Sequence, residues 1–396
     1  MPMAGCHKSR GKYIITGDDN LGRIFSRIAD FIRETDKLLL FLCVFSSLYG
    51  CLAVFTSTRY LESNRPVFIH FIATVIGIGC AVIISAFDFQ AFINKWLLIG
   101  IGGLIPVILT FFIGYAPNGT DDKAWLDLGF TTFQPSELLK ISFLITFSMH
   151  LDKIKDEINK PKFLLPLLAH GAFPVILIHF QGDDGTALVF AVMMLCMMWA
   201  AGVSWKYFVA AFGTVIVASP IIFFFIMNDD QRSRIINLFD IEADILGATY
   251  QQYYGRMALA NGGFFGQGLL KGKLTQSGFV PEGQNDFIFV SIGEELGFLG
   301  CLAVIILIGA ICMRSLKVAR ICKKPTGKYI CVGFFAMIFA QMVINIGMCV
   351  ALLPVIGVTL PFFSAGGTSL LCLYFGVGLV LSVYMHRNHS TIYLND

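Results

Sequence analysis

The chain has 396 residues, of which 56% are hydrophobic and only 14% charged, and its formal net charge is +3. A soluble domain carries roughly a quarter charged residues, so the composition excludes a soluble globular protein and indicates a membrane protein. The small net charge decides little, because the placement of charge in a membrane protein matters more than its sum.

Ten apolar segments have the roughly 17–25 residues that a helix needs to cross a bilayer. The fourth is the least apolar, since it begins with the polar stretch Gln-Pro-Ser-Glu at 134–137. The sequence therefore predicts an all-α polytopic membrane protein with about ten transmembrane helices and one long structured external loop. The expected spans are 38–58, 67–87, 96–115, 134–151, 163–180, 185–203, 205–227, 287–313, 328–353 and 369–386.

The placement of Lys and Arg predicts the orientation, because basic loops stay on the cytoplasmic side. Twenty of the 29 basic residues fall on one side of the expected bundle and eight on the other. We therefore expect both termini in the cytoplasm. The segments that then share the external face are 116–133, 181–184, 228–285 and 354–368.

The expected organisation is a cytoplasmic N-terminal segment over residues 1–37, a membrane domain over 38–386 that includes the external loop 228–285, and a cytoplasmic tail over 387–396. We expect no cleavable signal peptide, since no small-residue cleavage pattern follows the basic N-terminal segment. Nine of the eleven Cys lie in apolar runs, and none shows CxxC spacing. This pattern favours buried thiols over a metal site or disulfides.

Charged residues mark the fourth span and the segment before it. Glu137 and Lys140 lie three positions apart and share a helix face, where they can pair. The pair either pins helix packing or faces a polar cavity. Upstream, Lys123 and Trp125 are typical of an interfacial anchor, although the Trp ring could equally stack on a sugar.

The external segment 228–285 is longer than an ordinary connection. It is rich in Gly and aromatic residues rather than Ser, Pro or Lys, which favours a folded segment. Arg232 and Arg234, followed by Arg256, are candidate phosphate ligands, because guanidinium binds phosphate bidentately. They could equally be solvated charges paired with acidic residues of the same loop.

The carboxylates Glu282 and Asp286 end this segment, directly before the apolar run 287–290. Asp is a favoured helix N-cap, and a partly buried carboxylate with a raised pKa is a good general base. Both roles stay open for Asp286. Further on, Gly366 and Gly367 lie in the uncharged external loop 354–368, where they could offer backbone amides to an anion or form a plain turn.

Several short sequence blocks follow one another in a distinctive order along the chain. They are Trp-Leu-Asp-Leu-Gly at 125–129, Phe-Gln-Pro-Ser-Glu-Leu-Leu-Lys-Ile at 133–141, Gln-Arg-Ser-Arg at 231–234, Asn-Gly-Gly-Phe-Phe-Gly at 261–266, Pro-Glu at 281–282, Asp-Phe-Ile-Phe at 286–289, Gly-Glu-Glu-Leu-Gly at 293–297, Asn-Ile-Gly-Met at 345–348 and Leu-Pro-Val-Ile-Gly-Val-Thr-Leu-Pro at 353–361. Together they resemble the SEDS family, the RodA and FtsW membrane glycosyltransferases of bacterial cell-wall synthesis. The block at 345–348 leans toward the RodA branch, whereas 292–295 looks more like FtsW.

The resemblance implies a function in the bacterial cytoplasmic membrane, in cell elongation, division or sporulation. The implied substrate is lipid II, a disaccharide-pentapeptide on undecaprenyl pyrophosphate, polymerised into glycan strands with inversion at the anomeric carbon. The implied partner is a class B penicillin-binding protein, and no nucleic acid is expected. The family's catalytic Asp falls on Asp286, its motif Trp on Trp125, and the Glu and Lys of its Pro-Ser-Glu block on Glu137 and Lys140.

The chain departs from the family pattern at four places. Ala124 stands where the family has Arg, with Lys123 one position earlier, and Gly-Gln-Asn at 283–285 replaces a His-containing triplet before the catalytic Asp. Gln-Gly-Asp-Asp-Gly-Thr at 181–186 replaces Gln-Pro-Asp-Leu-Gly-Thr, and Ser-Ala-Gly-Gly at 364–367 replaces Ser-Tyr-Gly-Gly. The departures near Asp286 concern substrate contacts rather than the Asp itself.

Such chemistry needs a base for the acceptor hydroxyl, positive charge for the departing pyrophosphate and a groove for lipid. Asp286 is the expected base. Mg²⁺ or another divalent cation is a candidate cofactor, for which the sequence assigns no ligands. A lipid flippase and a scaffold that recruits a synthase are the alternatives, but the ionisable residues gather at the external rim, which favours surface chemistry over transport. The expected substrate-binding residues are Lys123, Trp125, Glu137, Lys140, Arg232, Arg234, Arg256, Glu282, Gly366 and Gly367.

Overall fold

The computed structural model describes most of the chain from Arg33 to Arg387. Asp36 begins a compact unit that contains all the helices and strands discussed below, whereas Met1–Thr35 is a separate unit. Most of the expected N-terminal segment 1–37 and of the tail 387–396 therefore lies outside the described residues. Within 33–387, the structure leaves out Glu62, 117–122, Leu128, 130–131, 241–243 and Ala248.

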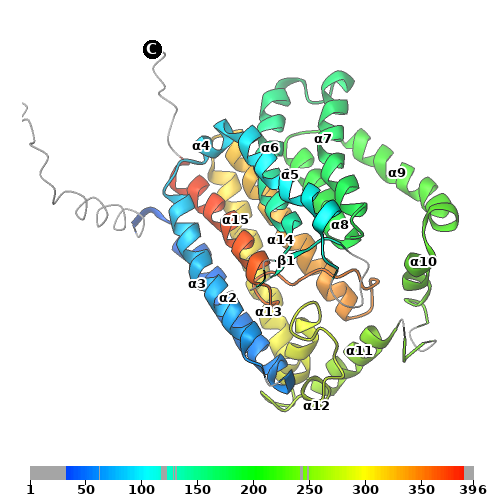
Figure 1. The fold of residues 1–396 in the computed structure, drawn as a ribbon. Helices are drawn as coiled ribbons and strands as arrows, with labels where there is room; N and C mark the ends of the chain where they lie inside the picture. The colour runs from blue at the N-terminus through cyan, green and yellow to red at the C-terminus, as the bar shows by residue number, and fades with distance from the viewer. Residues whose placement is uncertain are drawn as a thin grey trace, which may run out of the picture. The chain divides into compact units, whose positions relative to one another are not determined.

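Helices dominate the described residues (Figure 1). All ten expected spans coincide with helices, and the external segment holds three more, so the predicted fold class is confirmed. The helices are α2 (Lys37–Ser57), α3 (Arg65–Ser85), α4 (Phe89–Asn94), α5 (Trp96–Ile113), α6 (Pro135–Ile154), α7 (Pro161–His179), α8 (Asp184–Ala200), α9 (Trp205–Ile221), α10 (Asp229–Ile236), α11 (Tyr250–Gly262), α12 (Lys273–Gln276), α13 (Ile288–Ile321), α14 (Pro325–Cys349) and α15 (Gly367–Met385). Shorter turns of 3-10 helix lie at Arg59–Leu61 and Lys155–Glu157, and a π-helical turn at Ile222–Ile226 continues α9.

Eight of the described helices are long and apolar enough to cross a membrane. The two other expected spans fall short for different reasons. Helix α8 is apolar but has only 17 residues. Helix α6 has 20 residues, but charged side chains, including Glu137 and Lys140, lower its hydropathy. Both are nevertheless packed within the bundle, which is why their sequences tolerate a shorter or more polar segment.

The structure corrects two sequence predictions. The eighth span was expected to end at residue 313, but α13 continues to Ile321. Its last turns carry basic residues that lower hydropathy, yet Ser315, Val318 and Ala319 stay buried and keep the helix packed. A small antiparallel sheet also joins β1 (Leu126–Asp127) to β2 (Thr132–Phe133), where no strand was expected.

The core lies around α13, α14, α6, α8 and α15, and α3 lies along α15 (Figure 1). In α14 and α15, 67% of the residues in the most apolar stretch are buried, whereas the corresponding stretch of α9 has none. Helix α9 leaves the bundle and leads to α10 at its edge (Figure 1). The apolar surface of α9 is therefore available to lipid rather than to the protein core.

A break in α13 anchors the external segment. Gly297 has φ +67°, a left-handed conformation that interrupts the helix. The Gly-rich run 262–268 supplies partners to the freed backbone groups: Gln267 N–H donates to Glu294 O at 3.0 Å, and Phe298 N–H donates to Gly263 O at 2.9 Å. The Gly-rich block is therefore a packing device that holds the external segment against the helix following Asp286.

The Glu294 carboxylate reinforces this attachment. It is buried and accepts hydrogen bonds of 2.7–2.8 Å from the backbone of Leu274 and from the backbone and hydroxyl of Thr275, at the start of α12. Backbone donors at a helix start favour a negative charge. The Gly-Glu-Glu-Leu-Gly block thus has a structural function in holding α12, and through it the chain that leads to Asp286.

Candidate active site

Asp286 lies in the turn that precedes α13 and is partly buried. The N-cap of α13 is Phe287, and no side chain caps the helix, so the alternative role of Asp286 as an N-cap is wrong. Burial, followed by the negative charges of Glu282 and Asp183, raises the pKa of Asp286 from 3.8 to about 7. Among the described residues, no hydrogen bond or ion pair engages its carboxylate, which therefore keeps its lone pairs free to accept a proton.

Two loops meet at Asp286. The Ala365 N–H donates to Gln284 O at 2.8 Å, which ties loop 354–366 to the turn before α13. On the same loop, Gly357 has φ +65°, and a Cβ added there would lie 3.7 Å from Asp286 Oδ2. The backbone of this loop thus passes directly beside the carboxylate.

Asp183 is a site residue that the sequence analysis did not select. Its carboxylate accepts hydrogen bonds of 2.8 Å from Gln134 Nε2 and from Thr186 N–H at the start of α8. Its charge reaches Asp286 and raises the pKa of that group. The available signal was the family block at 181–186, in which an acidic residue opens a helix on the external side.

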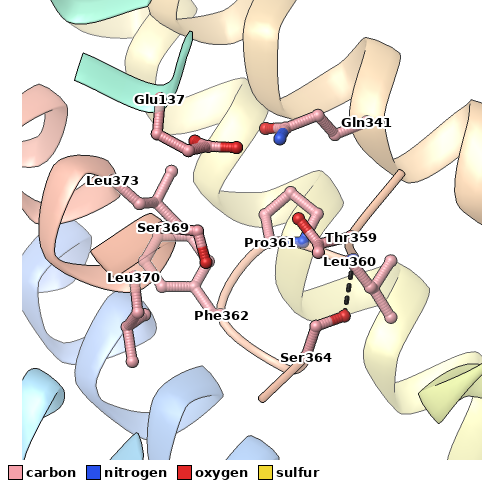
Figure 2. Close-up of a pocket in the computed structure, with 10 residues that line it drawn as sticks. All are labelled: Glu137, Gln341, Thr359, Leu360, Pro361, Phe362, Ser364, Ser369, Leu370 and Leu373. Carbon is pink, nitrogen blue, oxygen red and sulfur yellow. Dashed lines mark hydrogen bonds between the residues drawn. The ribbon is translucent and has the colours of Figure 1, made fainter. Parts of the chain in front are cut away.

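Glu137 and Lys140 form the predicted pair: Lys140 Nζ lies 2.9 Å from Glu137 Oε1, and both side chains are buried. The carboxylate of Glu137, on α6, faces Gln341, on α14, across a small cavity (Figure 2). The cavity has a volume of about 20 Å³, room for about one water molecule. The two side chains therefore form a buried ion pair within α6, and Glu137 also lines this cavity.

The expected anion ligands fall in different surroundings. Arg232 donates to the carbonyls of Phe223 and Phe224 at 2.8 and 2.9 Å. Its guanidinium therefore holds the π-helical turn Ile222–Ile226 that follows α9. Arg234 is exposed and reaches loop 354–366 through a 3.3 Å bond from Nη1 to Val355 O. Lys123 and Arg256 are exposed. Among the described residues, Arg234 is the cation of these four that bonds to the loop beside Asp286.

The other expected substrate-binding residues lie in the loops before β1 and before α13 and at the start of α15. Trp125 is partly buried, and its backbone pairs with Tyr115, with Tyr115 N–H donating to Trp125 O at 2.7 Å. Glu282 is exposed, has φ +50° and accepts a 2.6 Å bond from Asn285 Nδ2. Gly366 and Gly367 form the start of α15, with Gly366 as its N-cap. Residues 117–122, which precede Lys123, lie outside the described ranges.

A protein metal site requires several His, Cys, Asp or Glu side chains close together. Within the described ranges, no three His, Cys, Asp or Glu side chains gather closely enough to hold a metal ion. The described residues therefore assign no ligands to a divalent cation.

The amino-acid sequence matches a known family along most of its length. Residues 35–389 match the model of the FtsW/RodA/SpoVE family of cell cycle proteins. Peptidoglycan glycosyltransferase MrdB of Escherichia coli strain K12 is 36% identical over 267 residues, which cover 67% of this chain and 71% of that protein. Probable peptidoglycan glycosyltransferase FtsW of Geobacter metallireducens is 29% identical over 363 residues, covering 89% of this chain and 95% of that protein.

Solved structures share the fold. A chain from a peptidoglycan synthase complex that coordinates polymerisation and crosslinking superposes with a TM-score of 0.76 at 24% identity, covering 90% of this chain and 99% of that chain. The crystal structure of the rod shape determining protein RodA of Thermus thermophilus gives a TM-score of 0.67 at 24% identity, covering 90% and 98%. These likenesses establish the arrangement of the helices.

Proposed function

Because this chain belongs to the FtsW/RodA/SpoVE family of cell cycle proteins, we propose that it is a peptidoglycan glycosyltransferase that polymerises lipid II into glycan strands. It is a multi-pass membrane protein. The observation that carries the proposal is Asp286, a carboxylate with a pKa of about 7 that lies beside loop 354–366 and has no hydrogen-bond or ion-pair partner among the described residues. A base with a pKa near the working pH combines a useful ionised fraction with a strong drive to take a proton.

Asp286 is the general base in this proposal. Its ionised carboxylate takes the proton from the acceptor hydroxyl, whose oxygen then attacks the anomeric carbon of the donor sugar. The bond from that carbon to the pyrophosphate oxygen breaks, and the undecaprenyl pyrophosphate leaves with the electron pair. Attack from the face opposite the leaving group inverts the anomeric configuration.

The leaving pyrophosphate needs positive charge, and Arg234 is the best-placed candidate. It is exposed and contacts Val355, two residues from the Gly357 backbone that passes beside Asp286. Guanidinium binds phosphate oxygens bidentately, a geometry that an ammonium cannot reproduce. Lys140 is less suited, because Glu137 already neutralises it in a buried pair.

The flippase alternative is not favoured by these observations. A transporter requires a polar route near the bilayer midplane, lined by unpaired or substrate-binding groups. Glu137 and Lys140 are paired with each other rather than open to a substrate. The adjoining cavity of about 20 Å³ has room for about one water molecule, far less than a disaccharide needs. The reactive carboxylate lies instead at the start of α13, among the external loops.

We further propose a class B penicillin-binding protein as the crosslinking partner, and an orientation with both termini in the cytoplasm. The partner is supported by the structural likeness to a chain of a peptidoglycan synthase complex. The orientation is supported by the twenty basic residues on one side of the bundle. It places Asp286 outside the cell membrane, on the side where glycan strands are assembled.

Polymerisation of purified lipid II tests the proposed function. The full chain, purified together with its crosslinking partner, should convert lipid II into glycan strands, and Asp286→Asn should lower the rate by about 10²–10⁴-fold. Asp88→Asn, which changes a helix-capping carboxylate at the start of α4, is the matched control. Wild-type rates in Asp286→Asn would reject the assignment, and adding Mg²⁺ or a chelator to the same assay tests the expected divalent cation.

A further inference from the structure

Asn345 of α14 is fully buried, and its amide nitrogen contacts the backbone on both sides of the candidate site. Its Nδ2 donates to Asp286 O at 2.8 Å and to Val358 O at 2.7 Å. An amide has two N–H donors, and both are used here. Because both neighbours are carbonyl oxygens, the amide nitrogen rather than the oxygen must face them.

A second side chain extends this contact to the preceding peptide. Ser364 Oγ donates to Asn285 O at 2.8 Å. It also accepts from Leu360 N–H at 2.7 Å, a bond that Figure 2 shows. The Ala365 N–H donates to Gln284 O. Three consecutive carbonyls, those of residues 284, 285 and 286, are therefore each held by a donor from α14 or from loop 354–366.

We propose that Asn345 and Ser364 are positioning residues that hold the main chain of Asp286 so that its carboxylate stays beside Gly357. This inference rests on the proposed function, in which Asp286 is the base. Asp286 comes one residue before the N-cap Phe287, and Asp readily accepts hydrogen bonds from the first N–H groups of a helix. A capping carboxylate is a weaker base, because hydrogen bonds to the charged form lower its pKa. Holding the Asp286 carbonyl keeps the side chain out of that arrangement.

The residue type at position 345 follows from this geometry. An Asp side chain of the same shape would place oxygen atoms against two carbonyl oxygens and would lose both donors. A Leu side chain would fill a similar volume, but it would remove the amide donor from Val358 O and leave Asp286 O with the weak Cys349 thiol donor at 3.5 Å. A hydroxyl is sufficient at position 364, where one group must donate to a carbonyl and accept from an amide.

The test compares polymerisation kinetics of Asn345→Leu and Ser364→Ala with the wild-type chain, each purified with its crosslinking partner. We expect kcat to fall roughly 10- to 100-fold, as for a base displaced by about 1 Å, while KM for lipid II stays within about twofold. The pH at which the rate is half-maximal should also move to lower values, because a released carboxylate becomes better hydrated. A purely structural defect would lower the active fraction without moving that pH.

Two control variants separate positioning from general damage. Ser364→Thr keeps the hydroxyl and should retain the wild-type pH profile. Thr326→Val removes a buried hydroxyl that accepts a 2.9 Å bond from Gln90, at the other end of α14, and should leave kcat unchanged. If Asn345→Leu does not accumulate, the comparison of Ser364→Ala with Ser364→Thr carries the test.

The outcomes distinguish this inference from the proposed function. If the wild-type chain polymerises lipid II and Asp286→Asn is inactive, yet Asn345→Leu and Ser364→Ala keep the wild-type kcat and pH profile, the positioning role is overturned and the function stands. If the wild-type complex forms no glycan from lipid II, the function fails, and the positioning role fails with it.

Discussion

At the scale of single residues, the pKa of Asp286 depends on burial and on two carboxylates from different loops. Burial raises its pKa most, and the carboxylates of Glu282 and Asp183 contribute in that order. The two neighbours come from different loops, one four residues before Asp286 and the other at the start of α8. The fold therefore brings acidic groups together where the protonated form of one of them is favoured.

The pH dependence of polymerisation follows from this arrangement. A base must be deprotonated to act, so the rate should rise with pH through about 7, the pKa of Asp286. Glu282→Gln removes one negative neighbour and should move the midpoint to lower pH, and Asp183→Asn should do so by a smaller amount. Initial rates between pH 5 and 9 measure the midpoint, with Asp152→Asn, a partly buried residue near the end of α6 that pairs with Lys155, as the control. An unchanged midpoint in both variants would contradict this origin of the pKa.

The same carboxylate should destabilise the folded protein at high pH. The folded state holds the Asp286 proton up to about pH 7, whereas an ordinary Asp loses it near 3.8. Stability due to this group is therefore complete below about pH 4 and is lost as the pH rises to 7. The loss is at most about 4 kcal/mol, since one pKa unit corresponds to about 1.4 kcal/mol.

Asp286→Asn should accordingly raise the thermal unfolding midpoint at pH 8 and change it little at pH 4. The substitution removes the charge but keeps the shape of the side chain. Thermal unfolding of the purified chain in detergent, at both pH values, measures the difference. Equal midpoints for variant and wild type at pH 8 would mean that the folded environment does not penalise the charge.

Residues differ in how far the sequence alone identifies them. Asp286 could be selected because a carboxylate next to an apolar run carries its own chemical signal, and the family blocks support it. Asn345 could not, because its contact with Asp286 links segments separated by more than fifty residues. The family block at 181–186 marks Asp183 but does not show that its charge acts on Asp286. An Asn inside an apolar helix indicates a buried polar contact, but only the fold shows which carbonyls it binds.

At the scale of elements, the break in α13 determines how the external segment is attached. The Gly-rich run 262–268 and the motif 293–297 read as separate blocks in the sequence, and the structure joins them by backbone hydrogen bonds. The left-handed Gly297 makes these hydrogen bonds possible, because it frees backbone groups that a continuous helix would use internally. A hydropathy pattern contains no information about such a break, which is why α13 was expected as one uninterrupted span.

A pair of Gly→Ala substitutions tests this element. At Gly297, a Cβ would lie 2.6 Å from Phe264 O, and the left-handed backbone adds roughly 1–2 kcal/mol of strain. Gly297→Ala should therefore lower the thermal midpoint clearly. Gly213 lies inside α9 with no atom within 4 Å of an added Cβ, so Gly213→Ala should raise stability by roughly 0.5–1 kcal/mol. Similar effects of the two variants would argue against the break as a required feature.

At the scale of the whole molecule, hydropathy predicted the helices well because apolar length is a direct requirement of the bilayer. It predicted α6 least clearly, because packing inside the bundle lets the buried pair Glu137–Lys140 replace apolar side chains. It could not show that α9 stands outside the core while α14 and α15 form it, since all three are similarly apolar. Burial of a membrane helix depends on its neighbours rather than on its own composition.

The proposed orientation of the molecule rests on the placement of charge and is open to direct labelling. Basic loops resist transfer across the membrane, so the loop after α13 should stay in the cytoplasm and the external segment should face outward. Ser277→Cys and Lys323→Cys place thiols at exposed positions on the two sides. A membrane-impermeant thiol reagent should label Ser277→Cys in intact cells, and Lys323→Cys only after permeabilisation, with the wild-type chain as the background for its native Cys. The reverse pattern would put Asp286 on the cytoplasmic side, where an external glycan strand could not be its acceptor.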